Sequence, residues 1–187
     1  NTLPSKDVVL VLDTSGSMSG KMDTLKEAAS RFVDAVGGTM YNTRISVVEY
    51  DSSARVISNF STDKNELLNK ISMLTSDGGT QYTRALNMAD SVMQQSTARY
   101  RCMVMFSDGE PNDSKDTIRK LADRLGQSYY MYTVGLISNS YYGDLQRQIL
   151  VDVAGSEDRY FEASDIDKEK FMWSRENGFE ESIRQLN

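Results

Sequence analysis

The chain has 187 residues, of which 39% are hydrophobic and 26% charged, and its formal net charge is −6. This charge argues against a nucleic-acid or anionic-membrane partner, because such binding needs clustered lysine and arginine. The absence of histidine removes the usual zinc sites and every Ser-His or Cys-His nucleophile pair. The single cysteine, Cys102, cannot form an internal disulfide, and its apolar neighbours indicate a small buried side chain.

Length and patterning predict one domain over residues 1–187, large enough to fold alone. We expect this domain to have been cut from a longer protein, because Asn1 leads almost at once into a core strand. No apolar stretch approaches the roughly 20 residues of a membrane span. No secretory signal is visible, which says little about the parent of a fragment.

The predicted elements follow from the spacing of apolar residues. In chain order they are strand 7–12, helix 25–36, strands 45–50 and 54–60, helix 67–74, helix 85–93, strand 102–106, helix 118–125, strand 129–134, helix 145–153, strand 159–161 and a helical region over 166–186. Strand 7–12 is a continuous apolar run, which is typical of a strand covered on both faces. The methionines at 103, 105 and 131 fall in predicted strands, which indicates core packing.

Local signals mark several element ends. Asp51-Ser52-Ser53 separates two β-rich runs and predicts a hairpin with an antiparallel strand at the sheet edge. Asp63-x-x-Glu66 resembles a capping box before the helix at 67, and Gly126 stands where a C-cap glycine would. The alternation of strands and helices predicts an α/β fold: an open, doubly wound, mainly parallel sheet with helices on both faces.

Oxygen-bearing side chains follow three predicted strand or loop ends. Asp13, Ser15 and Ser17 come directly after the first strand, Thr80 follows two glycines, and Asp108 follows strand 102–106. In open sheets of this kind ligands bind outside the carboxyl ends of the strands. Carboxylates and hydroxyls are ligands for hard cations. The pattern therefore predicts a divalent-cation site at this edge of the sheet.

Each piece also has a simpler explanation when it is taken alone. The segment after Asp13 could form a turn that caps the next helix, Thr80 could be an N-cap, and Asp108-Gly109 is an ordinary turn dipeptide. These separate explanations become less convincing together, because the predicted fold places all three segments at the same edge of the sheet.

Three catalytic motifs fail at this place in the sequence. A phosphate loop ending at Lys21 would require glycine at Ser15 and Ser or Thr at Met22. A nucleophile elbow centred on Ser17 would require glycine at Ser15 and Ser19. A phosphotransferase of the haloacid-dehalogenase type would need a second aspartate where Ser15 stands.

Asp13-x-Ser15-x-Ser17, with Thr80 and Asp108, resembles the metal-ion-dependent adhesion site (MIDAS) of the von Willebrand factor A (VWA) domain family over nearly the whole chain. The resemblance implies a Rossmann-like fold that holds Mg²⁺, with Mn²⁺ or Ca²⁺ as alternatives. It implies that the three hydroxyls contact the ion directly or through water and that both carboxylates act partly through water. One position then stays free for the Asp or Glu carboxylate of a protein partner.

The resulting hypothesis is a non-enzymatic, metal-dependent adhesion or interaction module. Its sequence form around residues 7–18 is similar to bacterial secreted and cell-surface members, so we expect an extracellular or cell-surface location. Two alternatives stay open: a regulatory subunit of an intracellular ATP-driven complex of chelatase or MoxR type, and a metal-dependent hydrolase. The resemblance also implies a sliding C-terminal helix over 166–186, although Gly178 would cost roughly 1 kcal/mol inside such a helix.

Loop residues expected to border the ion form a predicted partner-binding rim. They are Met18, Ser19, Tyr82, Glu110, Asn112, Tyr141 and Tyr142. Exposed loop polarity and partial packing explain most of them equally well. The adjacent pair Tyr141-Tyr142 is the stronger candidate, because both aromatics cannot easily face one core and aromatic residues are common at contact surfaces.

Overall fold

The computed structural model describes residues 3–137 and 141–163. The strands are β1 (Lys6–Asp13), β2 (Thr43–Tyr50), β3 (Ala54–Ser61), β4 (Tyr100–Ser107), β5 (Tyr130–Gly135) and β6 (Tyr160–Glu162). The helices are α1 (Met22–Val36), α2 (Lys64–Ser72), α3 (Tyr82–Met93), α4 (Lys115–Leu125) and α5 (Gly143–Ala154), with short 3-10 turns η1 (Gly16–Met18), η2 (Thr39–Tyr41) and η3 (Glu157–Arg159). The predicted helical region 166–186 lies outside the described residues.

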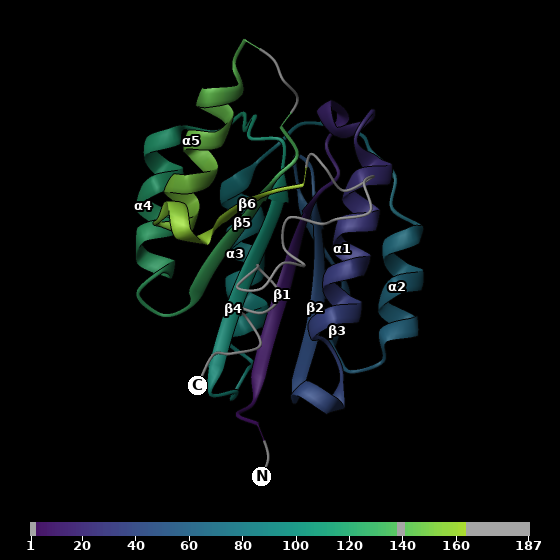
Figure 1. The fold of residues 1–187 in the computed structure, drawn as a ribbon. Coiled ribbons are helices and arrows are strands. Elements are labelled where there is room, and N and C mark those ends of the chain that lie inside the picture. Colours follow the sequence, from purple (N-terminus) through teal and green to yellow (C-terminus); the bar gives the residue numbers. More distant parts are fainter. Residues whose placement is uncertain (1–2, 138–140, 164–187) are drawn as a thin grey trace.

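One sheet forms the middle layer of the molecule, with its six strands in the order β3-β2-β1-β4-β5-β6 (Figure 1). β1 pairs in parallel with β2 and β4, and the parallel pairing continues through β5 to β6. β3 runs antiparallel to β2 at one edge. The predicted mainly parallel sheet with an antiparallel edge strand is confirmed.

β1 contributes to two hydrophobic cores, one on each face of the sheet. Val8, Leu10 and Leu12 pack with residues of α1 and α2, whereas Val9 and Val11 pack with residues of α3, α4 and α5. All five side chains are fully buried, and burial of each contributes about 1.5–3 kcal/mol. The helices therefore cover both faces, as predicted, and hold the end of β1 in the middle of the sheet (Figure 1).

Several local predictions can be compared directly with the structure. The Asp63 side chain accepts a 3.2 Å hydrogen bond from the Glu66 backbone N–H at the start of α2, so this cap is confirmed. Gly126 is the C-cap residue of α4, as predicted, but its φ is −63°, so this helix end does not use the left-handed conformation that glycine allows. Cys102 is fully buried, and desolvation raises the pKa of its thiol to about 12. Within the described ranges, no helix combines the length and apolar character that crossing a bilayer requires.

Candidate metal centre at the carboxyl edge of the sheet

Backbone hydrogen bonds join the three loops that carry the predicted ligands. The Gly16 N–H donates to the Gly78 carbonyl at 2.8 Å, which ties the loop after β1 to the loop before α3. The Asn112 N–H donates to the Thr80 carbonyl at 2.8 Å, and the Asn112 side-chain oxygen accepts from the Thr80 N–H at 2.7 Å. Asn112 thus clamps the buried Thr80 from both sides and ties it to the loop after β4.

Asp13 is the last residue of β1, and hydrogen bonds hold both of its carboxylate oxygens. Oδ1 accepts from the Ser15 backbone N–H at 2.9 Å and from the Ser15 hydroxyl at 2.5 Å. Oδ2 accepts from the Ser107 hydroxyl at 2.6 Å. Ser17 Oγ lies 3.2 Å from Ser15 Oγ. Asp13, Ser15 and Ser17 therefore form one connected group of oxygens at the end of the central strand.

Burial raises the pKa of the Asp13 carboxyl to about 6. Desolvation is the main cause, and the negative charge of Asp108 adds to it. The hydrogen bonds from Ser107 and Ser15 favour the ionised form and oppose this rise. Two buried carboxyl groups thus act on each other across the ends of β1 and β4, where a cation would stabilise both ionised forms.

Asp108 directly follows β4 and is fully buried. Its Oδ1 accepts a 3.2 Å hydrogen bond from the Glu110 N–H, but its Oδ2 accepts none from the described residues. Lys21 Nζ lies 3.6 Å from Oδ2. A buried polar atom without a hydrogen bond costs about 1–3 kcal/mol, and more when it is charged. This oxygen therefore fits a site that a metal ion completes.

The donor set consists of carboxylates and hydroxyls. Among residues 3–137 and 141–163, no three or more His, Cys, Asp and Glu side chains come together as a metal-binding group. Any ion held at this edge would thus depend on the hydroxyls of Ser15, Ser17 and Thr80 as well as on the two aspartates. Oxygen-only donors of this kind suit Mg²⁺, Mn²⁺ and Ca²⁺.

Two of the predicted rim residues are buried, so the expectation that they face a partner is wrong. Met18 ends the η1 turn and is fully buried in the core beneath α1, because this turn directs its side chain inward. Tyr82 is fully buried at the start of α3, its hydroxyl lies 2.6 Å from Ser107 Oγ, and its ring meets Tyr50 edge-on at 6.0 Å. Because Ser107 donates to Asp13, Tyr82 donates to Ser107 and supports the site from beneath.

The other rim residues lie at the surface. Ser19, Glu110 and Asn112 are exposed, as are Tyr141 and Tyr142, which are 95% and 61% exposed. The two tyrosine rings contact each other edge-on, with their centroids 5.3 Å apart. The pair immediately precedes α5, which packs closely on the Asp108 loop: a Cβ at Gly109 would lie 2.4 Å from the Gln146 carbonyl oxygen.

Sequence reasoning missed three residues of this region. Ser107 bridges Asp13 and Tyr82, and the available signal was a hydroxyl at the end of an apolar strand. Lys21 lies beside Asp108, although its place in the sequence suggests only the lysine of a phosphate loop, a motif that fails here. Leu145 was expected on an apolar helix face, yet it is 58% exposed next to the tyrosine pair.

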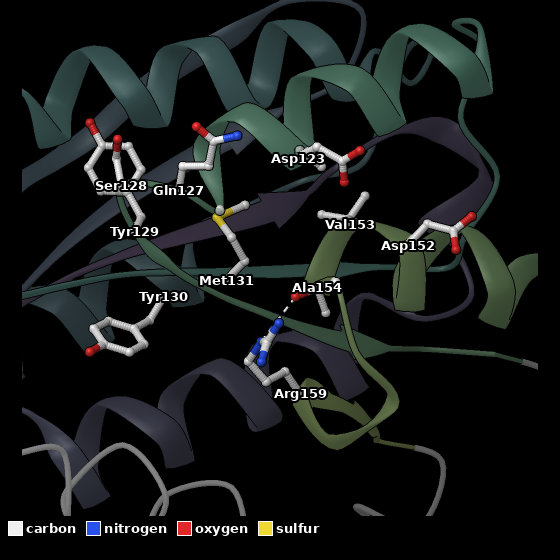
Figure 2. A pocket seen from close by; sticks show the side chains of 13 residues that line it. Asp123, Gln127, Ser128, Tyr129, Tyr130, Met131, Asp152, Val153, Ala154 and Arg159 are labelled. Carbon is white, nitrogen blue, oxygen red and sulfur yellow. Dashed lines mark hydrogen bonds between the residues drawn. The ribbon is translucent and has the colours of Figure 1, made fainter.

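A cavity of about 570 Å³ lies elsewhere, at the ends of α4 and α5 and the start of β5 (Figure 2). Arg159 lines this cavity and donates a 3.0 Å hydrogen bond from Nε to the Ala154 carbonyl (Figure 2). This hydrogen bond satisfies a carbonyl at the end of α5. None of the predicted metal ligands lines this cavity, so it is separate from the cluster of oxygen atoms at the carboxyl edge of the sheet.

Comparison with known proteins identifies the family. The family model for the von Willebrand factor type A domain matches residues 7–172. The minor fimbrium subunit Mfa5 of Porphyromonas gingivalis is 37% identical over 110 residues, which cover 55% of this chain and 9% of that protein. The chain spans less than a fifth of the length of the curated relatives it matches.

Solved structures agree on the fold. The vWF domain of the Porphyromonas gingivalis type V pili tip protein Mfa5 is 18% identical with a TM-score of 0.77, covering 99% of this chain and 95% of that one. The pilus adhesin SpaC of Lactobacillus rhamnosus GG is 14% identical with a TM-score of 0.76, covering 89% and 28%. Proximal thread matrix protein 1 from the mussel byssus, with zinc in its MIDAS motif, is 19% identical with a TM-score of 0.71, covering 89% and 43%. The chain belongs to the von Willebrand factor type A domain family.

Proposed function

We propose that this domain is a non-enzymatic, metal-dependent protein-binding module. Five residues would hold the divalent cation: Asp13, Ser15, Ser17, Thr80 and Asp108. A protein partner would add an Asp or Glu carboxylate to the ion. The observation that carries the proposal is Asp108 Oδ2, a buried carboxylate oxygen that accepts no hydrogen bond from the described residues, at the edge where the hydroxyls gather.

The hydrogen bonds of Asp13 support a particular division of roles. Ser15 and Ser107 already occupy both of its oxygens, so Asp13 is better placed to orient hydroxyls and water than to bind the ion directly. A cation with mostly neutral hydroxyls around it keeps more of its positive charge. When bound, the ion would supply a Lewis-acidic docking point, and that point attracts an external carboxylate more strongly than a neutralised ion does.

Mg²⁺ is the ion that we favour, with Mn²⁺ or Ca²⁺ as alternatives. The mussel byssus protein takes zinc at its MIDAS motif, but zinc sites in proteins usually include histidine or cysteine ligands. This chain has no histidine, and Cys102 lies within β4 in the core. The oxygen donors at the sheet edge therefore support a harder ion than zinc.

The exposed aromatic pair is the best candidate for the partner-binding rim. Tyr141 and Tyr142, with Leu145, present an apolar surface on the segment that packs against the loop carrying Asp108. Ser19 and Asn112 add polar groups, whereas Glu110 would repel a partner carboxylate. A partner that combines a carboxylate with an adjacent apolar side chain would suit this arrangement.

Adhesion at the cell surface is supported by relatives that are pilus subunits and adhesins. The alternative of an intracellular regulatory subunit would be favoured by stable co-purification of the domain with an ATPase. The hydrolase alternative would be favoured by metal-dependent turnover that Asp108→Ala removes. We infer that this domain is one module of a longer adhesive protein.

Calorimetric titration with Mg²⁺, Mn²⁺ and Ca²⁺ separately tests the metal site. We expect uptake of one ion by the wild-type domain and loss of uptake in Asp108→Asn. Asp116→Asn is the matched control, because that aspartate lies on α4 with its side chain 85% exposed. Failure of the wild-type domain to take up any of the three ions would refute the proposal.

A further inference from the structure

Lys21 occupies a position that local helix rules do not explain. It is the N-cap of α1, with φ −122° and ψ 1°, and its side chain makes no capping hydrogen bond. Oxygen-bearing side chains are preferred at this position because they accept from the free N–H groups of the first turn. A positive charge here also opposes the positive end of the helix macrodipole. Residues that break local rules in this way often serve a site.

The side chain of Lys21 extends toward the carboxylate oxygen of Asp108 that accepts no hydrogen bond from the described residues. Its Nζ lies 3.6 Å from Asp108 Oδ2, while Asp108 is fully buried and the Lys21 side chain is 25% exposed. At this separation the two groups form an ion pair, because 3.6 Å exceeds the usual length of an N–H···O hydrogen bond. The ammonium therefore supplies positive charge to the same oxygen that is proposed to face the metal.

We propose that Lys21 is a tethered counter-ion that competes with the divalent cation for Asp108. This inference rests on the proposed metal site. Without the ion, Lys21 balances the charge of a buried carboxylate and stabilises the folded domain. With the ion, the same ammonium repels a dication a few ångströms away and weakens its binding. Lys21 thus sets metal affinity below the limit that the oxygen donors alone would give.

The expected size of the effect follows from Coulomb's law. Even with the dielectric constant of bulk water, the repulsion between a unit charge and a double charge about 6 Å apart changes the metal dissociation constant about tenfold, and the partial burial of Lys21 makes this the smallest effect expected. Lys21 weakens metal binding through repulsion but stabilises the metal-free domain through its ion pair. Removal of the ammonium should therefore strengthen Mg²⁺ binding and lower the melting temperature of the metal-free domain. A purely structural lysine would not give this combination.

The test compares Lys21→Met with Lys26→Met in the metal-free and metal-bound domain. Both substitutions remove one positive charge from the start of α1, but the Lys26 ammonium donates to the Ser72 carbonyl at 3.0 Å. We expect Lys21→Met to bind Mg²⁺ about tenfold more tightly by calorimetry and to lower the metal-free melting temperature by about 2–4 °C. We expect Lys26→Met to leave the Mg²⁺ affinity unchanged. Lys21→Arg keeps the charge and should retain wild-type affinity within about threefold.

An Mg²⁺ affinity of Lys21→Met that is weaker than, or within about twofold of, the wild-type value would overturn the counter-ion role while the metal site itself stands. Absence of uptake of Mg²⁺, Mn²⁺ and Ca²⁺ by the wild-type domain would instead remove the metal site and this inference with it. Tighter binding in Lys26→Met as well would assign the effect to net charge and also overturn the role of Lys21.

Discussion

Ser107 donates a 2.6 Å hydrogen bond to Asp13, and this bond joins the last residue of β4 to the last residue of β1. The Tyr82 hydroxyl, 2.6 Å from the same serine oxygen, extends the connection to α3. All three side chains are fully buried. The orientation of Asp13 is therefore set by protein groups from three different elements.

Removal of the Ser107 hydroxyl should destabilise the domain. A hydrogen bond to a charged group contributes about 1.5–3 kcal/mol, so we expect Ser107→Ala to lower the free energy of unfolding by about 2 kcal/mol at pH 7, measured by urea denaturation. Tyr82→Phe should cost less, because Asp13 then keeps its bond from Ser107. Equal stability of Ser107→Ala and the wild-type domain would contradict this account.

The metal-free domain should lose stability as pH rises through the titration of Asp13. The pKa of this carboxyl is about 6 in the folded domain, against an ordinary value of 3.8, so the folded state holds the proton more tightly than the unfolded chain does. The Asp13 contribution is thus fully present below about pH 4 and is lost as pH rises through 6, amounting to about 3 kcal/mol.

Because other carboxylates titrate in the same window, the measurement is the difference between the wild-type domain and Asp13→Asn. Urea unfolding at pH 4 and pH 7 in a chelator should show the wild-type domain losing stability relative to the variant. A constant difference across this range would mean that Asp13 titrates near its ordinary value.

Gly109 should not tolerate a side chain. It has φ +78°, and a Cβ would lie 2.4 Å from the Gln146 carbonyl oxygen in α5. We expect Gly109→Ala to cost at least about 2 kcal/mol in the free energy of unfolding, because both the left-handed backbone and the close approach are lost. Gly20→Ala is the control, since among the described residues no heavy atom outside its two chain neighbours lies within 4 Å of its added Cβ. Similar unfolding midpoints for the two variants would argue against this packing of α5.

Metal removal should lower the melting temperature through binding linkage. At a metal concentration about 100 times the dissociation constant, binding adds about 2.7 kcal/mol to the stability. For a domain of this size that corresponds to a rise of about 5–11 °C, which a chelator should reverse. Thr80→Val keeps the shape but removes the proposed hydroxyl ligand, so its response to Mg²⁺ should be reduced. A full response in Thr80→Val would exclude Thr80 from the ligand set.

The order of the strands and helices could be predicted because the spacing of apolar residues differs between them. Apolar residues recur every three or four positions in the helices, whereas in the buried strands they follow one another directly. The run at 7–12 is apolar at nearly every position, and β1 indeed lies between cores on both faces of the sheet. The hairpin around Asp51 and the cap at Asp63 depend on neighbours a few residues away, so the local sequence contains the whole signal.

The surroundings of the site were harder to predict, because they depend on contacts between distant segments. Met18 and Tyr82 stand at loop-to-helix junctions, where periodicity does not tell which side a residue faces, and both are buried. The role of Ser107 requires β4 to lie beside β1, a pairing across 94 positions of sequence. The metal ligands themselves stay a prediction that the titrations above test.

The loop connections at the sheet edge have a kinetic consequence. The Thr14 carbonyl accepts a 2.9 Å hydrogen bond from the Asp77 N–H, alongside the bonds that join Gly16 to Gly78 and Thr80 to Asn112, and protein atoms alone supply all of these. The ordering of the loops is thus completed on folding. If the domain binds a metal ion as proposed, loss of water from the arriving ion, rather than rearrangement of the chain, would limit the rate of metal binding.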